Sequence, residues 1–129
     1  MMRDALAATH GGGRLATGLV CLVVPHVVER LWFGRSRPGP GTVLMRAVGA
    51  RDVAIGAGLL SARRDAERAR PWLLAGALCD AIDVLATFAS RRHVPRRSVV
   101  GLTAAAAPSL AWQVALARPR PPAPGGRGA

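Results

Sequence analysis

The sequence is dominated by four apolar stretches, which are separated by short segments rich in Arg, Pro and Gly. Each stretch has about 20 residues, the length that a helix rising about 1.5 Å per residue needs to cross a hydrocarbon core of about 30 Å. Gly and Pro at the boundaries are typical of helix ends. The pattern predicts an all-α, antiparallel bundle of four transmembrane helices, at about residues 14–33, 42–62, 71–90 and 98–117 of a membrane domain that spans 14–117.

The two ends of the chain differ from this domain. Residues 1–13 precede the first apolar stretch and include three consecutive glycines, so we expect a flexible N-terminal segment there. Residues 118–129 consist largely of Pro, Gly and Arg, a composition that cannot bury a core, and we expect this tail to be disordered.

The positions of the charged residues favour a membrane protein over a soluble four-helix bundle. A helix on the surface of a soluble protein carries polar or charged residues at every third or fourth position. Residues 15–28 and 98–117 contain no charged residue. Trp32, Trp72 and Trp112 lie near the ends of the stretches, as in the aromatic belts of membrane proteins. Recovery of the chain in the soluble fraction without detergent would favour the soluble bundle instead.

The net charge of +11 comes from arginines that lie mostly between the apolar stretches. Nucleic-acid-binding proteins instead cluster basic residues on one face, often with aromatic side chains for stacking, so we expect the lipid bilayer and no nucleic acid as partner. With four spans, the termini and the middle loop share one side of the membrane. That side carries nine arginines against six in the other two loops, which predicts cytoplasmic termini in the cell membrane.

Six charged residues within or next to the apolar stretches are the main candidates for a site. A charge at mid-bilayer costs a few kcal/mol and normally faces the interior of the bundle, where it finds a partner. We therefore expect an intramembrane ion-pair network formed by Glu29, Arg46, Arg51, Asp52, Asp80 and Asp83.

The register of antiparallel hairpins predicts the individual pairs. Asp80 and Asp83 are three residues apart and share one helix face. A hairpin of the second and third helices places Arg51 level with these two carboxylates, so we predict that it pairs with one of them. A hairpin of the first and second helices places Glu29 level with Arg46, which predicts a second pair. Asp52 would bridge to another helix or to Arg30.

Two functions are compatible with such a network. It can be a structural device that fixes helix register, or it can serve as a proton or ion relay in a small proton-coupled transporter or channel subunit. The D-x-x-D spacing is also half of the aspartate set of the CDP-alcohol phosphotransferases, but the remaining motif is missing and the chain is too short for that fold. The sequence predicts no enzyme activity, metal or cofactor.

Small residues and one proline predict how the helices pack. Small residues at four-residue spacing let membrane helices approach closely, and they also offer a contact for a second copy or another membrane protein. Pro25 should kink the first helix next to His26, which makes these two residues a candidate polar kink site. The candidate packing residues are Gly49, Ala50, Ala54, Gly56 and Gly58 in the second helix and Gly101, Ala105 and Ser109 in the fourth.

The second and third helices also carry a motif. Arg46, Gly49, Arg51, Asp52 and Gly56 form the pattern R-x-x-G-x-R-D-x-x-x-G, and the D-x-x-D pair follows. In this respect the chain resembles a family of small integral membrane proteins that are common in actinobacteria, over about residues 14–117. The resemblance implies a four-helix membrane protein and assigns no activity.

Overall fold

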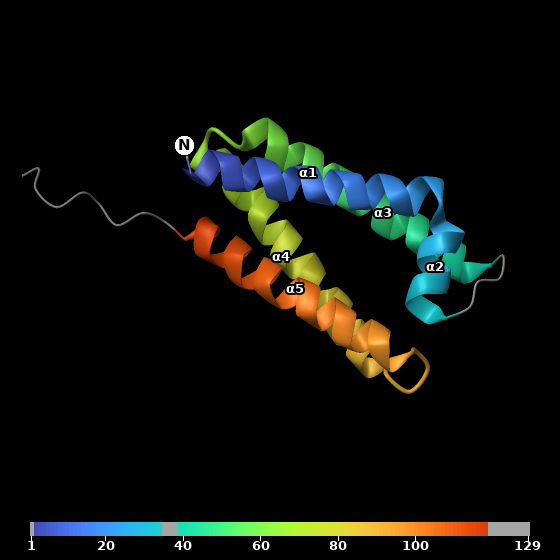
Figure 1. Cartoon of the computed structure of the whole chain (residues 1–129). Coiled ribbons are helices and arrows are strands. Elements are labelled where there is room, and N and C mark those ends of the chain that lie inside the picture. The colour runs from blue at the N-terminus through green and yellow to red at the C-terminus, as the bar shows by residue number, and fades with distance from the viewer. Residues whose placement is uncertain (1, 35–38, 119–129) are drawn as a thin grey trace, which may run out of the picture.

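The computed structural model describes residues 2–34 and 39–118 and is helical throughout, with no strand in this part of the chain (Figure 1). Residues 63–65 and 90–95 form short turns, and consecutive long helices run antiparallel. The helices are α1 (Met2–Val23), α2 (Pro25–Phe33), α3 (Pro40–Ala62), α4 (Ala66–Ala89) and α5 (Arg96–Ala117).

The first predicted helix, at 14–33, differs most from the structure. Helix α1 begins at Met2, so most of the segment expected to be flexible is helical, including its three glycines. The helix ends at Val23, and α2 turns away from it by 100°. The break lies where the proline was expected to disturb the helix: Val24 leaves the helical conformation, and Pro25 starts α2 without a backbone N–H to donate.

Helix α4 begins earlier than the sequence predicts. The expected start was Pro71, but the Asp65 side chain caps the helix by accepting hydrogen bonds from the backbone N–H groups of Glu67 (3.0 Å) and Arg68 (3.2 Å). This cap satisfies two of the free donors of the first turn, so Pro71 lies inside α4. The predicted stretches at 42–62 and 98–117 lie within α3 and α5. The predicted tail, apart from Arg118, falls outside the described residues.

Helix α1 packs along α3, and helix α4 packs along α5 (Figure 1). The first pair is very close because glycines face each other across it. A Cβ added to Gly18 would lie 2.7 Å from the Gly49 carbonyl oxygen, and one added to Gly56 would lie 2.7 Å from the Gly11 carbonyl oxygen. In each helix the two glycines are seven residues apart, two helical turns, and so lie on one face.

The small residues that the sequence predicts at helix contacts pack less than the glycine contact of α1 with α3 does. Gly49 and Gly56 are buried as expected, and Gly58 lies against the Trp72 ring. Successive residues of a helix differ by about 100° in direction. Because Gly49 faces α1, its neighbour Ala50 points outward. Ala50 and Ala54 are accordingly exposed. Gly101 and Ala105 of α5 are also exposed and are not buried against another helix as expected.

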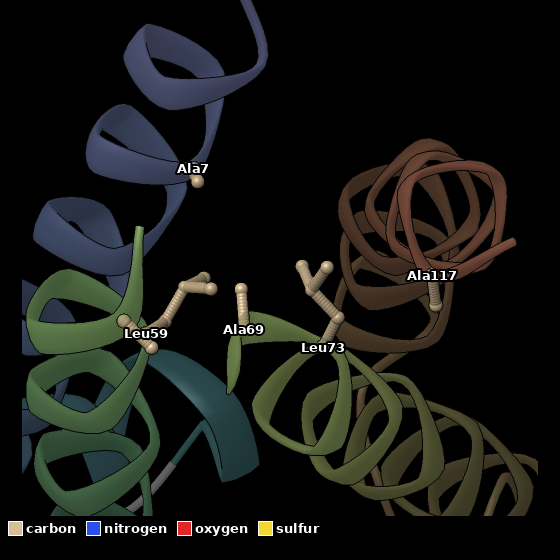
Figure 2. Packing of buried hydrophobic residues seen from close by; sticks show 6 residues of the cluster. Ala7, Leu59, Ala69, Leu73 and Ala117 are labelled. Atoms are coloured by element: carbon tan, nitrogen blue, oxygen red, sulfur yellow. The ribbon is translucent and has the colours of Figure 1, made fainter. Parts of the chain in front are cut away.

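The two helix pairs meet at one end of the molecule and diverge towards α2 (Figure 1). The closed end is a small hydrophobic cluster to which all four long helices contribute (Figure 2). Trp112 and Leu116 pack against this cluster. The residues of the cluster are Ala7, Leu59, Ala62, Ala69, Leu73 and Ala117. Alanine at these positions lets the helices approach closely, and this contact fixes the angle between the two pairs.

Two features of the side-chain distribution are unusual for a water-soluble protein: charged groups are buried, and many large apolar groups are exposed. The buried polar side chains are Arg14, Glu29, Asp52, Ser98 and Gln113. The outer surface carries many large apolar side chains, among them Leu31, Leu78, Ile82, Leu85 and Phe88. In water, both features would cost free energy, because buried charges lose hydration and exposed apolar groups are hydrated unfavourably.

Two helices, α4 and α5, are each long and apolar enough to cross a membrane. The bent pair α1 and α2 also meets this condition when the two helices are taken together. Helix α3 carries Arg46, Arg51 and Asp52 and is not among these helices. Length and composition therefore support a membrane protein with two candidate spans, or three if the bent pair counts as one.

The glycine contact between α1 and α3 predicts a difference between two glycine-to-alanine variants in α1. Gly18→Ala should lower the free energy of unfolding by about 1–3 kcal/mol, because its methyl group meets the backbone of α3. Gly12→Ala has nothing within 4 Å of the added carbon and should be neutral or stabilising by up to about 1 kcal/mol. Unfolding by SDS in mixed micelles, followed by circular dichroism, measures both. Equal effects of the two substitutions would contradict the close contact.

Candidate functional site

Arg14, near the middle of α1, is the centre of a buried polar network. Its Nη1 donates a hydrogen bond to Asp52 Oδ1 on α3 at 2.8 Å, and its Nη2 forms an ion pair with Asp80 Oδ1 on α4. The same Nη2 also donates to the backbone carbonyl of Gly76 at 3.0 Å. The side chain of Arg14 is only 8% exposed. One guanidinium group therefore connects three helices, and it does so between the two helix pairs.

Arg51 extends this network along α3. It binds Asp83 through two parallel hydrogen bonds, from Nη1 to Oδ1 at 3.0 Å and from Nη2 to Oδ2 at 2.8 Å. It also lies 3.3 Å from Oδ1 of Asp52, the atom that Arg14 contacts. Asp52 is therefore shared by the two arginines. Arg51 and Asp83 are more accessible than Arg14, with side chains 26% and 32% exposed.

Helix α5 contributes uncharged hydrogen-bond donors. The Ser109 hydroxyl donates to Asp80 Oδ2 at 3.0 Å, and the Gln113 amide donates to the same oxygen at 2.7 Å. Asp80 therefore uses one oxygen for Arg14 and the other for α5. Gln113 is 1% exposed, so the amide donates to the carboxylate out of contact with solvent. With α5 included, all four long helices take part in the network.

His10 lies one turn before Arg14, on the side of the hydrophobic cluster. Its Nε2 accepts a hydrogen bond from Nε of Arg14 at 3.4 Å, and its ring lies against Trp112 with 5.0 Å between ring centroids. A nitrogen that accepts a hydrogen bond carries no proton, so the imidazole is neutral in this arrangement. His10 therefore adds no positive charge to the network.

A cavity of about 680 Å³ lies between the two helix pairs, on the side that faces α2. Arg14, Arg51 and the three aspartates of the network line one part of it. Most of the remaining wall is apolar and comes from α2, α3 and α5, including Val28, Trp32, Met45, Val48, Leu102 and Ala106. The volume lies within the range of about 300–1,000 Å³ that is typical of small-molecule sites.

The structure brings together four of the six charged residues that the sequence singles out. Arg51 pairs with Asp83, one of the two carboxylates that the hairpin register places level with it. Asp52 does bridge to another helix, but its partner is Arg14. Asp80 completes the set and also receives a hydrogen bond from Ser109, which the sequence marked only as a packing residue.

Glu29 and Arg46 are not part of the network. Glu29 is buried on α2 and accepts a hydrogen bond from the Thr42 hydroxyl at 3.2 Å. Arg46 is exposed, and within residues 2–34 and 39–118 no ion pair joins it to Glu29. The predicted pair fails because α2 bends away from α1, which changes the depth at which Glu29 lies. At the kink, Pro25 is buried, but His26 is exposed and takes no part in the buried network.

Sequence reasoning missed Arg14 for the same reason. A first span at 14–33 puts Arg14 at its end, among the arginines that flank the membrane. When α1 ends at Pro25 instead, the pairing of Gly18 with Gly49 sets the register of α1 against α3. That register brings Arg14 level with Asp52. Pro25 was the available signal, had it been interpreted as the end of a helix. Gln113 gave a weaker signal, as an amide in an otherwise apolar stretch.

In the part of the chain that the structure describes, no three His, Cys, Asp or Glu side chains are arranged to hold a metal ion.

No family model, curated protein or solved structure matches the chain. The geometry of the network and the cavity is therefore the basis for assigning a function.

The position of Arg14 predicts a strong effect of its removal. Arg14→Met should lower the free energy of unfolding by about 3–5 kcal/mol, because Asp52 and Asp80 would stay buried without their main counter-charge. Arg46→Met removes an exposed arginine and should change the free energy of unfolding by no more than about 0.5 kcal/mol. The same SDS unfolding measurement applies to both.

A second variant separates charge from packing at this position. Adding Asp80→Asn to Arg14→Met should restore part of the lost stability, since the buried carboxylate charge is then removed. Arg14→Met as stable as Arg46→Met would show that the network does not hold the helices together.

Proposed function

We propose that the chain is a non-enzymatic, multi-pass integral membrane protein in which α1, α3, α4 and α5 cross the bilayer and the buried Arg/Asp network fixes their arrangement. The observation that carries this proposal is the combination of buried charges with an apolar outer surface. Charged and amide groups lie inside, bonded to one another, while Leu, Val, Ile and Phe side chains cover the outside. Lipid is the solvent in which this distribution is favourable.

The arrangement of the helices supports a topology with both termini on one side. The start of α1, the α3–α4 turn and the end of α5 lie at the closed end of the molecule (Figure 1), where Arg3 donates a hydrogen bond to the Leu116 carbonyl. Arg14 belongs to the network and no longer counts as a flanking residue. Eight arginines then flank this end against six in the other two loops, which favours cytoplasmic termini in the cell membrane.

Helix α2 then lies across the bundle at the opposite membrane face. It is bent by 100° from α1, and the Ser98 hydroxyl at the start of α5 donates to the Trp32 carbonyl at its end. A helix in this position, with a tryptophan near one end, suits the membrane interface. In this topology, α1 crosses the bilayer alone, and the bent pair is not a single span.

A structural role of the network follows from the properties of the lipid environment. Apolar side chains gain nothing by leaving lipid for the interior of the bundle, so polar contacts and close packing hold membrane helices together. The glycine contact holds α1 on α3, while the two helix pairs meet in the small cluster at the closed end and at the Trp72 and Trp112 rings. Arg14 and Arg51 supply the additional bonds between the pairs.

Topology can be tested with single cysteines at opposite ends of the bundle. In a background with Cys21→Ala and Cys79→Ala, Arg92→Cys between α4 and α5 should react with a membrane-impermeant maleimide in intact cells. Arg64→Cys in the α3–α4 turn should react only after permeabilisation. Both positions are exposed, so accessibility within the protein is matched. Labelling of both from one side, or release of the protein from membranes by alkaline carbonate, would refute the proposed topology.

The cavity favours one alternative, a small proton-coupled transporter or channel subunit. Asp80 and Asp83 line the cavity. Carboxylates in a proton relay need such access to a cavity. A proton that moved along this path would have to leave or enter the bidentate pair of Arg51 and Asp83.

Reconstitution into liposomes distinguishes the two functions. With a structural network, proton flux measured with an entrapped pH-sensitive dye should equal that of empty liposomes, and the variant with Asp80→Asn and Asp83→Asn should be less stable than the wild type. Proton flux by the wild type that disappears in a well-folded variant would establish the transporter instead. Arg46→Met is the control for a change of charge outside the network.

A further inference from the structure

The cavity between the helix pairs combines two kinds of wall. Towards α2 and α5 it is lined by apolar and aromatic side chains, among them Trp32, Phe33 and Leu102. Towards the middle of α3 and α4 it reaches the charge network. A void of about 680 Å³ with one apolar and one charged part matches a molecule that is itself apolar at one end and charged at the other.

The charge of the network determines which sign such a molecule would carry. Among the described residues that line the cavity, two are arginines and three are aspartates, and His10 is neutral as an acceptor of Arg14. With the aspartates ionised, the wall therefore holds one negative charge more than its arginines neutralise. A surplus charge next to an apolar space is costly unless a counter-charge comes close.

The three aspartates are not equally available to a ligand. Asp52 lies between the two arginines, and Asp80 is held by Arg14 on one oxygen and by α5 on the other. Within residues 2–34 and 39–118, Asp83 has only Arg51 as ion-pair partner, and its side chain is the most exposed of the three, at 32%. Because Arg51 also contacts Asp52, it keeps an anionic partner when Asp83 turns towards another cation.

We propose that this cavity binds an amphipathic organic monocation, with its charge at Asp83 and its apolar body between α2 and α5. The surplus negative charge of the wall disfavours binding of an organic anion. The apolar wall of α2 disfavours binding of a small hydrated cation. The aromatic side chains of Trp32 and Phe33 suit the apolar body of such a ligand, since aromatic rings offer a large apolar contact area. This inference depends on the cavity and not on the number of helices that cross the bilayer.

The test uses two probes of the same shape and opposite charge. The full chain is purified and placed in lipid nanodiscs, and binding of tetraphenylphosphonium is measured by equilibrium dialysis, with protein-free nanodiscs to subtract partition into lipid. Tetraphenylphosphonium should bind saturably. Tetraphenylborate, the anionic counterpart, should show no binding above that of the protein-free nanodiscs.

Two variants address the charge and the space separately, each with a matched control. Asp83→Asn should weaken tetraphenylphosphonium binding by about tenfold or more, whereas Glu67→Gln removes an exposed acid outside the cavity and should leave it unchanged. Gly101→Phe should weaken it similarly, because Gly101 lines the cavity and has open space beside it. Gly12→Phe has equally open surroundings outside the cavity and should have no effect.

The outcomes decide the proposal in each case. Saturable binding of the cation that is weakened by Asp83→Asn and Gly101→Phe but not by the two controls supports it. Absence of saturable binding, equal binding of tetraphenylborate, or unchanged binding by Gly101→Phe overturns it. If Asp83→Asn does not fold, Gly101→Phe and the comparison of the two ions decide together, since this substitution leaves every member of the network in place. Binding that Gly101→Phe abolishes but that is equal for both ions would identify the cavity as a site for neutral apolar molecules, such as lipid chains, and would also refute the proposal.

Discussion

The Arg14 guanidinium, bound to carboxylates of α3 and α4, is the contact on which the arrangement of the two helix pairs depends. Apolar packing between the pairs involves a cluster built mainly from alanine, together with the contacts of Gly58 with the Trp72 ring and of His10 with the Trp112 ring. In the proposed four-span arrangement, apolar burial also gives no net stabilisation among the helices, because lipid is as apolar as the side chains that contact it. Charged and hydrogen-bonded groups therefore have to supply the contacts that determine how the pairs are placed.

Arg14 reaches its partners because α1 lies unusually close to α3. The facing glycines bring the two backbones together, and their spacing of two turns repeats the contact along the helices. This contact sets the depth of Arg14 relative to Asp52. The break at Pro25 is equally important, because it ends α1 and lets α2 turn across the open end of the bundle. A straight helix over 2–33 would leave the cavity without the wall that α2 provides.

The same arrangement explains why a cavity exists next to the network. The pairs are fixed at the closed end by the cluster and in the middle by the arginines, and beyond this point they diverge (Figure 1). Asp80 is saturated by contacts from two sides, whereas Asp83 borders the open part of the cavity with Arg51 as its ion-pair partner. Structural and ligand-binding properties can therefore belong to different members of one network. This division is why the proposed cation would meet Asp83 first.

The sequence by itself determined the helical class, the approximate positions of the later helices and the pairing of Arg51 with the aspartates of α4. These follow from local periodicity and from a hairpin whose turn is short, so that few registers are available. Only the tertiary structure decided that Arg14 is central, that Glu29 lies apart from Arg46, and that Ala50 and Ala54 face outward. Each of these depends on the 100° bend at Pro25 or on the glycine contact of α1 with α3. A bend and a helix–helix distance change which residues are level with one another, and neither is encoded in the periodicity of a single helix.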